Sequence, residues 1–174
     1  AHERILAAFL AHYADILNGT QIQAKWLAMT SVTVVGVVNA DIGLYLPDFR
    51  AGERTFQLLT QVAGRAGRGE RPGRVIIQTY QPDHYAVDAA SRYDYEGFAA
   101  AELESRRASR YPPFARLVRM MFTHANPRFA REEALRVQRA LSLRRAEMGS
   151  DVDVIGPSPA YVPRVRGRWR WQLL

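Results

Sequence analysis

The chain has 174 residues, a length that allows one large domain or two small ones. Hydrophobic residues make up 48% of it and charged residues 24%, so it can bury a core but is too highly charged for a membrane protein. The sequence contains no Cys, which excludes a disulfide scaffold, a thiolate zinc site and a cysteine nucleophile. We therefore expect a cytoplasmic protein. Because the sequence starts at Ala1 without an initiator Met and stops within the apolar run 171–174, we also expect a fragment.

The net charge of +7 is concentrated in the second half of the chain. Residues 1–87 contain 8 basic and 7 acidic side chains, whereas residues 88–174 contain 16 and 10. Of the 24 basic residues only Lys25 is Lys, and the others are Arg, whose planar guanidinium suits bidentate contact with phosphates. This bias either indicates a nucleic-acid partner or reflects a GC-rich genome.

Hydrophobic periodicity predicts alternating helices and strands in the first half of the chain. Helices are expected at 3–13 and 52–65, and strands at 15–17, 32–38 and 74–79. The run 32–38 is rich in Val without alternation, which is typical of a strand buried on both faces of a parallel sheet. The first half is therefore predicted to be an α/β unit in which helices cover a sheet.

A second pattern follows a predicted helix at 94–107. Tyr111-Pro112-Pro113 interrupts the periodicity and marks the expected domain boundary. The segments beyond it are predicted as a strand at 114–122, a helix at 127–148 and strands at 152–155 and 161–171. This β-α-β-β order is most of an α+β ferredoxin-like unit, which would need one more helix and strand.

Several kinds of catalytic centre lack the residues that they need. The four His residues do not have metal-ligand spacing, and we expect no metal site. The pairs Glu102/Glu104 and Glu132/Glu133 are predicted on helices at spacings that do not converge, and we interpret both as solvated. A Walker A loop needs a Gly-rich backbone before a Lys and a Ser or Thr, and Lys25 has no such context. This chain therefore cannot by itself make the main phosphate contacts of ATP hydrolysis.

The most informative segment is Gln61-Val62-Ala63-Gly64-Arg65-Ala66-Gly67-Arg68-Gly69, at the end of a predicted helix. Arg65 and Arg68 are three residues apart and lie on one face, and the small residues between them let a second surface come close. Such a pair can bind a phosphate that another part of the molecule supplies. The segment resembles motif VI of two-lobed helicases, in which these arginines reach across the cleft to the nucleotide.

The flanking sequence resembles one helicase family in order and spacing. The elements that carry the resemblance are DILNGTQ (15–21), TVVGVVNAD (33–41), LPDFRAGERTFQLLT (46–60), PGRVIIQTY (72–80), YPPF (111–114) and RGRWRWQLL (166–174). Together they are similar to the C-terminal part of the PriA family of primosomal helicases, also called primosomal protein N′, over nearly the whole chain.

The resemblance implies a replication-restart protein that recognises stalled or abandoned forks, unwinds DNA 3′ to 5′ with ATP and Mg²⁺, and initiates primosome assembly. Residues 1–90 would be the rear of a RecA-like second helicase lobe, 91–111 a helical connector, and 112–174 an incomplete C-terminal domain that binds DNA and partners. The implied partners of this monomer are forked and single-stranded DNA, single-stranded DNA-binding protein and other primosome proteins. The Walker motifs and the Cys ligands of the family's Zn²⁺ would lie upstream of Ala1.

The resemblance also implies roles for individual residues. Arg65 and Arg68 would be catalytic arginine fingers, and Lys25 would contact DNA. ATP binding and its coupling to DNA would involve Gly19, Thr20, Gln21, Asp41, Gln61, Gly64 and Gly67.

One departure from the family pattern lies in motif V. Where the family has Lys-Gly-x-Asp-Phe-Pro, this chain has Lys25-Trp26-Leu27-Ala28-Met29-Thr30, so a Gly and a carboxylate are both missing. Either the coupling of ATP to DNA is weakened or this stretch carries a sequence error. Two interpretations are therefore open: a fragment of an ATP-dependent helicase, inactive alone, or a non-catalytic scaffold that binds DNA and primosome proteins.

Four arginines alternate with apolar residues near the end of the chain: Arg164, Arg166, Arg168 and Arg170. On one strand their guanidinium groups would share a face at a spacing of about 6.6 to 6.8 Å, close to that of neighbouring phosphates. The pattern predicts either contacts with DNA phosphates that do not read bases or a solvated outer face of a sheet.

Overall fold

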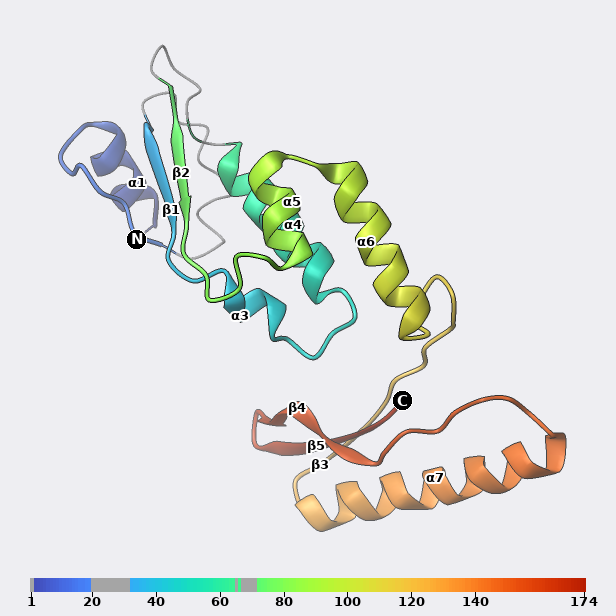
Figure 1. The fold of residues 1–174 in the computed structure, drawn as a ribbon. Helices are drawn as coiled ribbons and strands as arrows, with labels where there is room; N and C mark the ends of the chain where they lie inside the picture. Colours follow the sequence, from blue (N-terminus) through green and yellow to red (C-terminus); the bar gives the residue numbers. More distant parts are fainter. Residues whose placement is uncertain (1, 20–31, 65, 67–71) are drawn as a thin grey trace. The chain divides into compact units, whose positions relative to one another are not determined.

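The computed structural model describes residues 2–19, 32–64, 66 and 72–174 (Figure 1). The chain forms two compact units, residues 1–108 and 109–174. The first contains a parallel two-stranded sheet and the second an antiparallel three-stranded sheet, which confirms the mixed α/β class. Among the described residues, no helix is long and apolar enough to cross a membrane.

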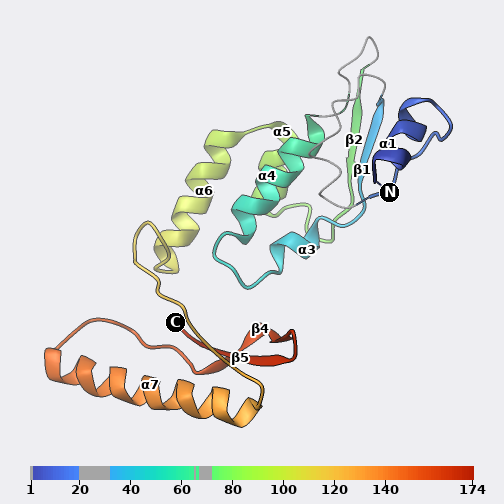
Figure 2. The same cartoon turned by 180° about the vertical axis from the view of Figure 1, so that it is seen from behind.

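The first unit is a small parallel sheet with helices beside it. Its elements are α1 (His2–Leu10), β1 (Val34–Val37), α3 (Asp41–Leu44), α4 (Ala51–Ala63), β2 (Arg74–Ile77), α5 (Tyr85–Arg92) and α6 (Tyr95–Ala108). Strands β1 and β2 are parallel, with Val35 opposite Val75. Figures 1 and 2 show α4 and α5 on one side of this sheet and α1 on the other.

The core of the first unit lies between this sheet and its helices. Phe56 of α4 stacks on Phe98 of α6 with ring centroids 4.1 Å apart, and Leu59 is only 1% exposed. Val37 and Ile77 pack against this core from one face of the sheet. Val34, on the other face of β1, is 57% exposed. The prediction of a strand buried on both faces is therefore wrong for the described residues, in which the core covers only one face.

Helix α5 is missed by sequence reasoning because both of its ends use unusual residues. His84 caps the N-terminus by accepting a hydrogen bond from Ala86 N at 3.2 Å, although Ser, Thr, Asp and Asn are the common capping residues. Tyr93 ends the helix in the left-handed conformation that Gly usually adopts. The short helix α3 is missed as well, because its single turn is too brief for a periodic pattern.

The second unit is a three-stranded sheet with one long helix. Its elements are β3 (Met120–His124), α7 (Pro127–Met148), β4 (Ser158–Val165) and β5 (Arg168–Leu173). The sheet order is β3-β5-β4, so α7 connects the two outer strands, as in a split β-α-β unit. Asn126 caps α7 by accepting from Arg128 N at 2.9 Å, and Gly149 follows with a φ of 57°. These caps explain why the predicted bounds of 127–148 are confirmed.

Four strand predictions are wrong in whole or in part. Residues 15–17 and 152–155 are not strands. The strand predicted from 114 begins only at Met120, because Phe114 N donates to Tyr111 O at 2.9 Å in a preceding turn. The strand predicted over 161–171 is instead the hairpin of β4 and β5, with its turn at Arg166 and Gly167.

Candidate functional site

Asp41 joins the two loops that follow the parallel strands of the first unit. Its side chain is buried, at 4% exposure. Its Oδ1 accepts a hydrogen bond from Thr79 Oγ1 at 2.7 Å and its Oδ2 accepts one from Tyr80 N at 3.1 Å. The hydrogen bond from Thr79 holds the pKa of Asp41 below its usual value. Both carboxylate oxygens of Asp41 therefore have partners within the chain.

The position of Asp41 matters because ligands of open α/β sheets bind beyond the carboxyl ends of the strands. Asp41 follows β1, and Thr79 follows β2. The hydrogen bond between their side chains holds the two loops together at this edge, where Ala40 N also donates to Gln78 O at 3.1 Å. The predicted role of Asp41 in nucleotide coupling stays a prediction, and the geometry shows that Asp41 links the loops after β1 and β2. Thr79, which sequence reasoning missed, is its principal partner.

Helix α4 presents the start of the predicted arginine segment. Gln61 lies in its last turn, and Gly64 is the C-cap residue, whose N–H donates to Thr60 O at 3.0 Å. Val62 and Ala63 are buried, so the end of the helix is anchored in the core. Arg65, Gly67 and Arg68 lie outside the described residues, as do Thr20, Gln21, Lys25 and the altered stretch 26–30. Gly19 is described and lies exposed in an irregular segment.

A polar network holds α4, α5 and α6 together. Glu102 Oε1 accepts from Arg106 Nε at 2.7 Å, and Glu102 Oε2 accepts from Tyr85 Oη at 2.6 Å. Arg106 also donates to Glu53 Oε2 at 2.8 Å, which ties α6 to the first turn of α4. Burial, followed by the hydrogen bond to Glu102, raises the pKa of Tyr85. The three helices are thus joined by charge-assisted hydrogen bonds as well as by the core.

This network corrects the interpretation of Glu102 as a solvated residue. Its side chain is buried, with the residue only 6% exposed, because α6 turns it toward Tyr85 rather than toward solvent. Glu104, two residues on, is exposed as expected. The signal that could have found Glu102 is Arg106, which follows it at the helical spacing of four residues.

The four arginines near the end of the chain do not share one face. Arg164 lies opposite Trp169 and Val165 lies opposite Arg168 in the β4–β5 ladder. Directly paired residues share a face, so Arg164 is on the face of Trp169, whereas Arg168 and Arg170 are on the other. The prediction of one strand with one cationic face is wrong, because Arg166 and Gly167 form the turn of a hairpin.

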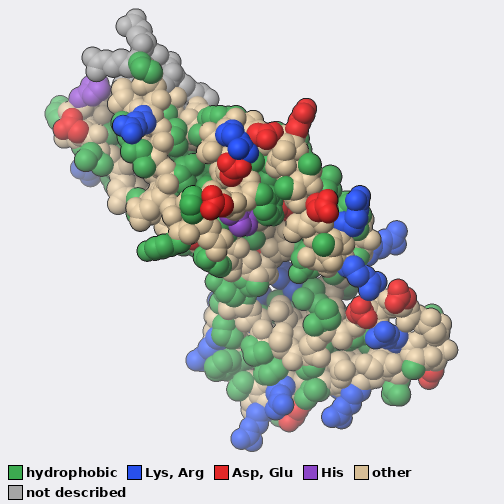
Figure 3. Space-filling model, in the orientation of Figure 1, with side chains coloured by type: hydrophobic (Ala, Val, Ile, Leu, Met, Phe, Trp, Pro, Cys, Tyr) green, Lys and Arg blue, Asp and Glu red, His purple; other side chains and the backbone are tan. Residues whose placement is uncertain are grey.

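These arginines nevertheless remain accessible. Arg164, Arg166 and Arg168 are exposed and Arg170 is half-buried. None of the four forms an ion pair with a described carboxylate. On the face seen in Figure 3, Arg side chains project from the second unit into solvent. The hairpin is therefore a cationic surface without internal neutralisation.

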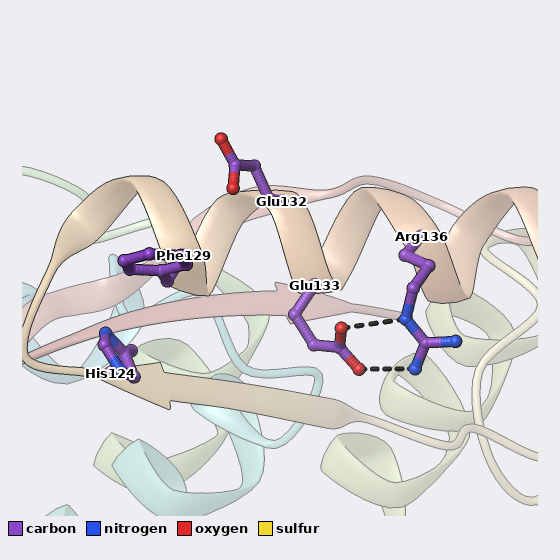
Figure 4. A pocket seen from close by; sticks show the side chains of 5 residues that line it. All are labelled: His124, Phe129, Glu132, Glu133 and Arg136. Carbon is purple, nitrogen blue, oxygen red and sulfur yellow. Dashed lines mark hydrogen bonds and ion pairs between the residues drawn. The ribbon is translucent and has the colours of Figure 1, made fainter.

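A shallow hollow lies between the end of β3 and the first half of α7 (Figure 4). The rings of His124 and Phe129 meet edge to face, with centroids 5.2 Å apart. Glu133 accepts two hydrogen bonds from Arg136, at 2.8 and 2.6 Å, while Glu132 points away from this pair. The two glutamates therefore do not act as a carboxylate pair, and within the described ranges no three His, Asp or Glu residues could hold a metal ion.

Comparison with known proteins places these features in a family. Residues 107–174 match the family model described as the primosomal protein N C-terminal domain. Over 172 residues, 99% of its length, the chain is 45% identical to the replication restart protein PriA of Bacillus subtilis (strain 168), of which it covers 21%. The chain belongs to the PriA family. The family that the sequence motifs predict is thus confirmed.

Other relatives give the same result. The chain is 44% identical over its whole length to the replication restart protein PriA of Synechocystis sp. and covers 21% of that protein. It is 43% identical over 172 residues to the replication restart protein PriA of Treponema pallidum, of which it covers 26%. The chain thus spans about a fifth to a quarter of the length of these PriA proteins.

Proposed function

We propose that this chain is part of a replication restart protein. The observation that carries the proposal is the 45% identity over 99% of the chain to a protein of that name. The finer assignment is an ATP-dependent 3′ to 5′ DNA helicase that recognises stalled forks and initiates primosome assembly in the cytoplasm. Residues 1–90 would contribute the rear of the second helicase lobe, and 112–174 the start of the C-terminal domain.

In this proposal the first unit positions arginine fingers for a nucleotide held mainly by another lobe. Helix α4 is anchored by its buried residues and by the Glu53–Arg106 ion pair, and the Arg65–Arg68 segment follows its end. Arginine fingers neutralise the charge that develops on a transferred phosphoryl group. The Asp41–Thr79 hydrogen bond joins the loops after the carboxyl ends of β1 and β2, and would stiffen the sheet against which α4 packs.

The proposal involves two metal ions, Mg²⁺ and Zn²⁺, and the described residues of this chain hold protein ligands for neither. Mg²⁺ would arrive with ATP as part of the substrate, and its protein ligands belong to the Walker motifs, which this sequence lacks. The Zn²⁺ of the family does not fit this chain, because the sequence has no Cys and the described His, Asp and Glu residues form no metal-binding group.

The second unit would bind DNA through charge. Its uncompensated arginines attract phosphates, and the proposed partners are forked and single-stranded DNA, single-stranded DNA-binding protein and other primosome proteins. We also propose that the protein acts as a monomer.

The experiment that tests the enzymatic assignment measures DNA-stimulated ATP hydrolysis by the longer protein that contains this chain. Arg68→Ala should lower kcat by about a thousandfold with little change in nucleotide affinity. Arg74→Ala, which removes an exposed Arg at the start of β2, is the matched control and should keep normal turnover. Wild-type turnover in Arg68→Ala would remove the finger assignment.

A second candidate, the non-catalytic scaffold, is favoured by one sequence feature. Trp26 and Ala28 stand where the family pattern has Gly and Asp. If the longer protein binds forks without hydrolysing ATP, the double change Trp26→Gly and Ala28→Asp should restore hydrolysis. Hydrolysis that starts only in the restored protein would establish the scaffold for the natural sequence.

A further inference from the structure

The tip of the β4–β5 hairpin places an arginine where a turn disfavours it. Arg166 and Gly167 have φ values of 49° and 79°, so both central residues of the two-residue turn are left-handed. Turns of this kind prefer Asn-Gly or Asp-Gly, because most side chains are strained at positive φ. The stability of the turn therefore does not explain why position 166 is an Arg, which points to a role for this side chain outside the hairpin.

The tip extends beyond the rest of the sheet. The last β3–β5 pair is His124 opposite Trp169, so the segment 165–168 projects past β3 with only its own two strands. Arg166 forms no hydrogen bond or ion pair with the described residues. From Val154 to Leu174 the sequence contains four Arg and no Asp or Glu. The projecting tip is thus cationic without a local counter-charge.

Arginines lie on both faces of the hairpin next to this tip. Arg164 is on the face of Trp169, and Arg168 is on the opposite face. A flat row of arginines would suit one DNA strand lying across one face. A hairpin with arginines on both faces and at its tip instead suits a groove that is bordered on each side by a phosphate backbone.

The neighbouring tryptophans are poorly placed to stack on bases. The Arg164 guanidinium lies over the Trp169 ring, 5.4 Å from its centroid, and Arg131 lies over the Trp171 ring at 5.8 Å. Proteins that bind single strands without sequence preference use exposed aromatic faces as stacking platforms. Covered rings beside free arginines favour a duplex over a single strand.

From these observations we infer that the hairpin tip inserts Arg166 into the minor groove of duplex DNA. Arg164 and Arg168 then contact the phosphates of the two strands that border the groove. A minor groove about 6 Å wide admits one arginine side chain, and its negative potential is strongest where it is narrow, as in A-tracts. The inference rests on the proposed function in one respect only, that the ligand of the second unit is DNA.

The test uses the 174-residue chain and short duplexes with a central A-tract or a G·C-rich centre, with binding followed by fluorescence anisotropy. The wild type should prefer the A-tract, and the minor-groove ligand netropsin should displace it. Arg166→Asn gives the turn a residue that it prefers, so thermal stability should be kept or raised. The same variant should lose about tenfold in affinity and lose the A-tract preference. Arg139→Gln, which removes the same charge from an exposed site on α7, should keep that preference.

Three results would overturn the inference while leaving DNA binding intact. They are wild-type affinity in Arg166→Asn, binding that netropsin does not reduce, and tighter binding to a single strand of the same length. The absence of binding to any DNA would overturn the inference together with the proposed DNA-binding role. Failure of the Arg68→Ala test would affect only the enzymatic assignment.

Discussion

Arg164 and Trp169 face each other across the β4–β5 ladder, with the guanidinium 5.4 Å from the centre of the indole ring. This contact places Arg164 on the opposite face of the hairpin from Arg168. The two arginines are four positions apart, a spacing that would put them on the same face of a single strand. The two arginines therefore have different roles in stability, and the difference can be measured.

We expect Arg168→Gln to weaken DNA binding similarly for unrelated sequences and to lower the log–log salt slope by about 0.9 on a duplex. The second unit should keep its stability, because Arg168 is exposed and has no ion-pair partner among the described residues. Arg164→Gln should instead destabilise the unit by about 0.5 to 1 kcal/mol, since it removes the contact with Trp169. Titrations at several salt concentrations, with thermal unfolding, check both outcomes. An unchanged slope in Arg168→Gln means that its contact lies elsewhere.

Gly52 of α4 has no room for a side chain. A Cβ there would lie 2.6 Å from Tyr85 Oη and 2.8 Å from Glu102 Oε2, inside the buried network. Gly52→Ala should therefore lower the free energy of unfolding by about 1 to 3 kcal/mol. Gly36→Ala is the matched control, because no atom of the described residues lies within 4 Å of its Cβ position. Urea unfolding, with amide hydrogen exchange in α4 to α6, distinguishes the two variants. Equal stability of both would contradict the packing described.

Tyr85 makes the first unit sensitive to alkaline pH. Burial and the hydrogen bond to Glu102 raise its pKa above the ordinary value of 10.0. A raised pKa in the folded state adds stability that is fully present below the unfolded pKa and is lost as pH rises above it. We expect unfolding above about pH 10 to be steeper in the wild type than in Tyr85→Phe.

At neutral pH Tyr85→Phe should itself lower stability by about 1 to 3 kcal/mol, because buried Glu102 loses a donor. Tyr80→Phe, at a residue that is 87% exposed, is the control and should leave stability at neutral pH unchanged. Thermal unfolding across the pH range measures both effects. A Tyr85→Phe profile parallel to that of the wild type would show that Tyr85 ionises equally in both states.

The isolated 174-residue chain should show no DNA-stimulated ATP hydrolysis. It lacks a Walker A loop, so arginine fingers would have no tightly bound nucleotide on which to act. Phosphate release from the purified chain, with and without forked DNA, is the measurement. Release above background that tracks the chain through purification would refute this expectation.

The sequence by itself determined the features that depend on local pattern. Residues 127–148 form a helix with the predicted bounds, because Asn126, Pro127 and Gly149 specify its ends within one turn of the chain. The parallel pairing of 34–37 with 74–77 follows from β-branched runs separated by a helix. Family membership was also readable, since its motifs are contiguous residue strings.

The tertiary structure decided what depends on residues far apart in the chain. Glu102 is buried because Tyr85 and Glu53, from two other helices, meet it and Arg106. Asp41 binds Thr79, 38 positions away, and no local spacing predicts that pairing. The four arginines lie on two faces because the turn at Arg166 and Gly167 reverses the chain direction. Every second residue lies on the same face of a sheet only as long as one strand continues without a turn. The position and direction of a strand depend on the strands to which it is hydrogen-bonded, and these can be distant in the sequence. Local sequence patterns therefore do not predict them.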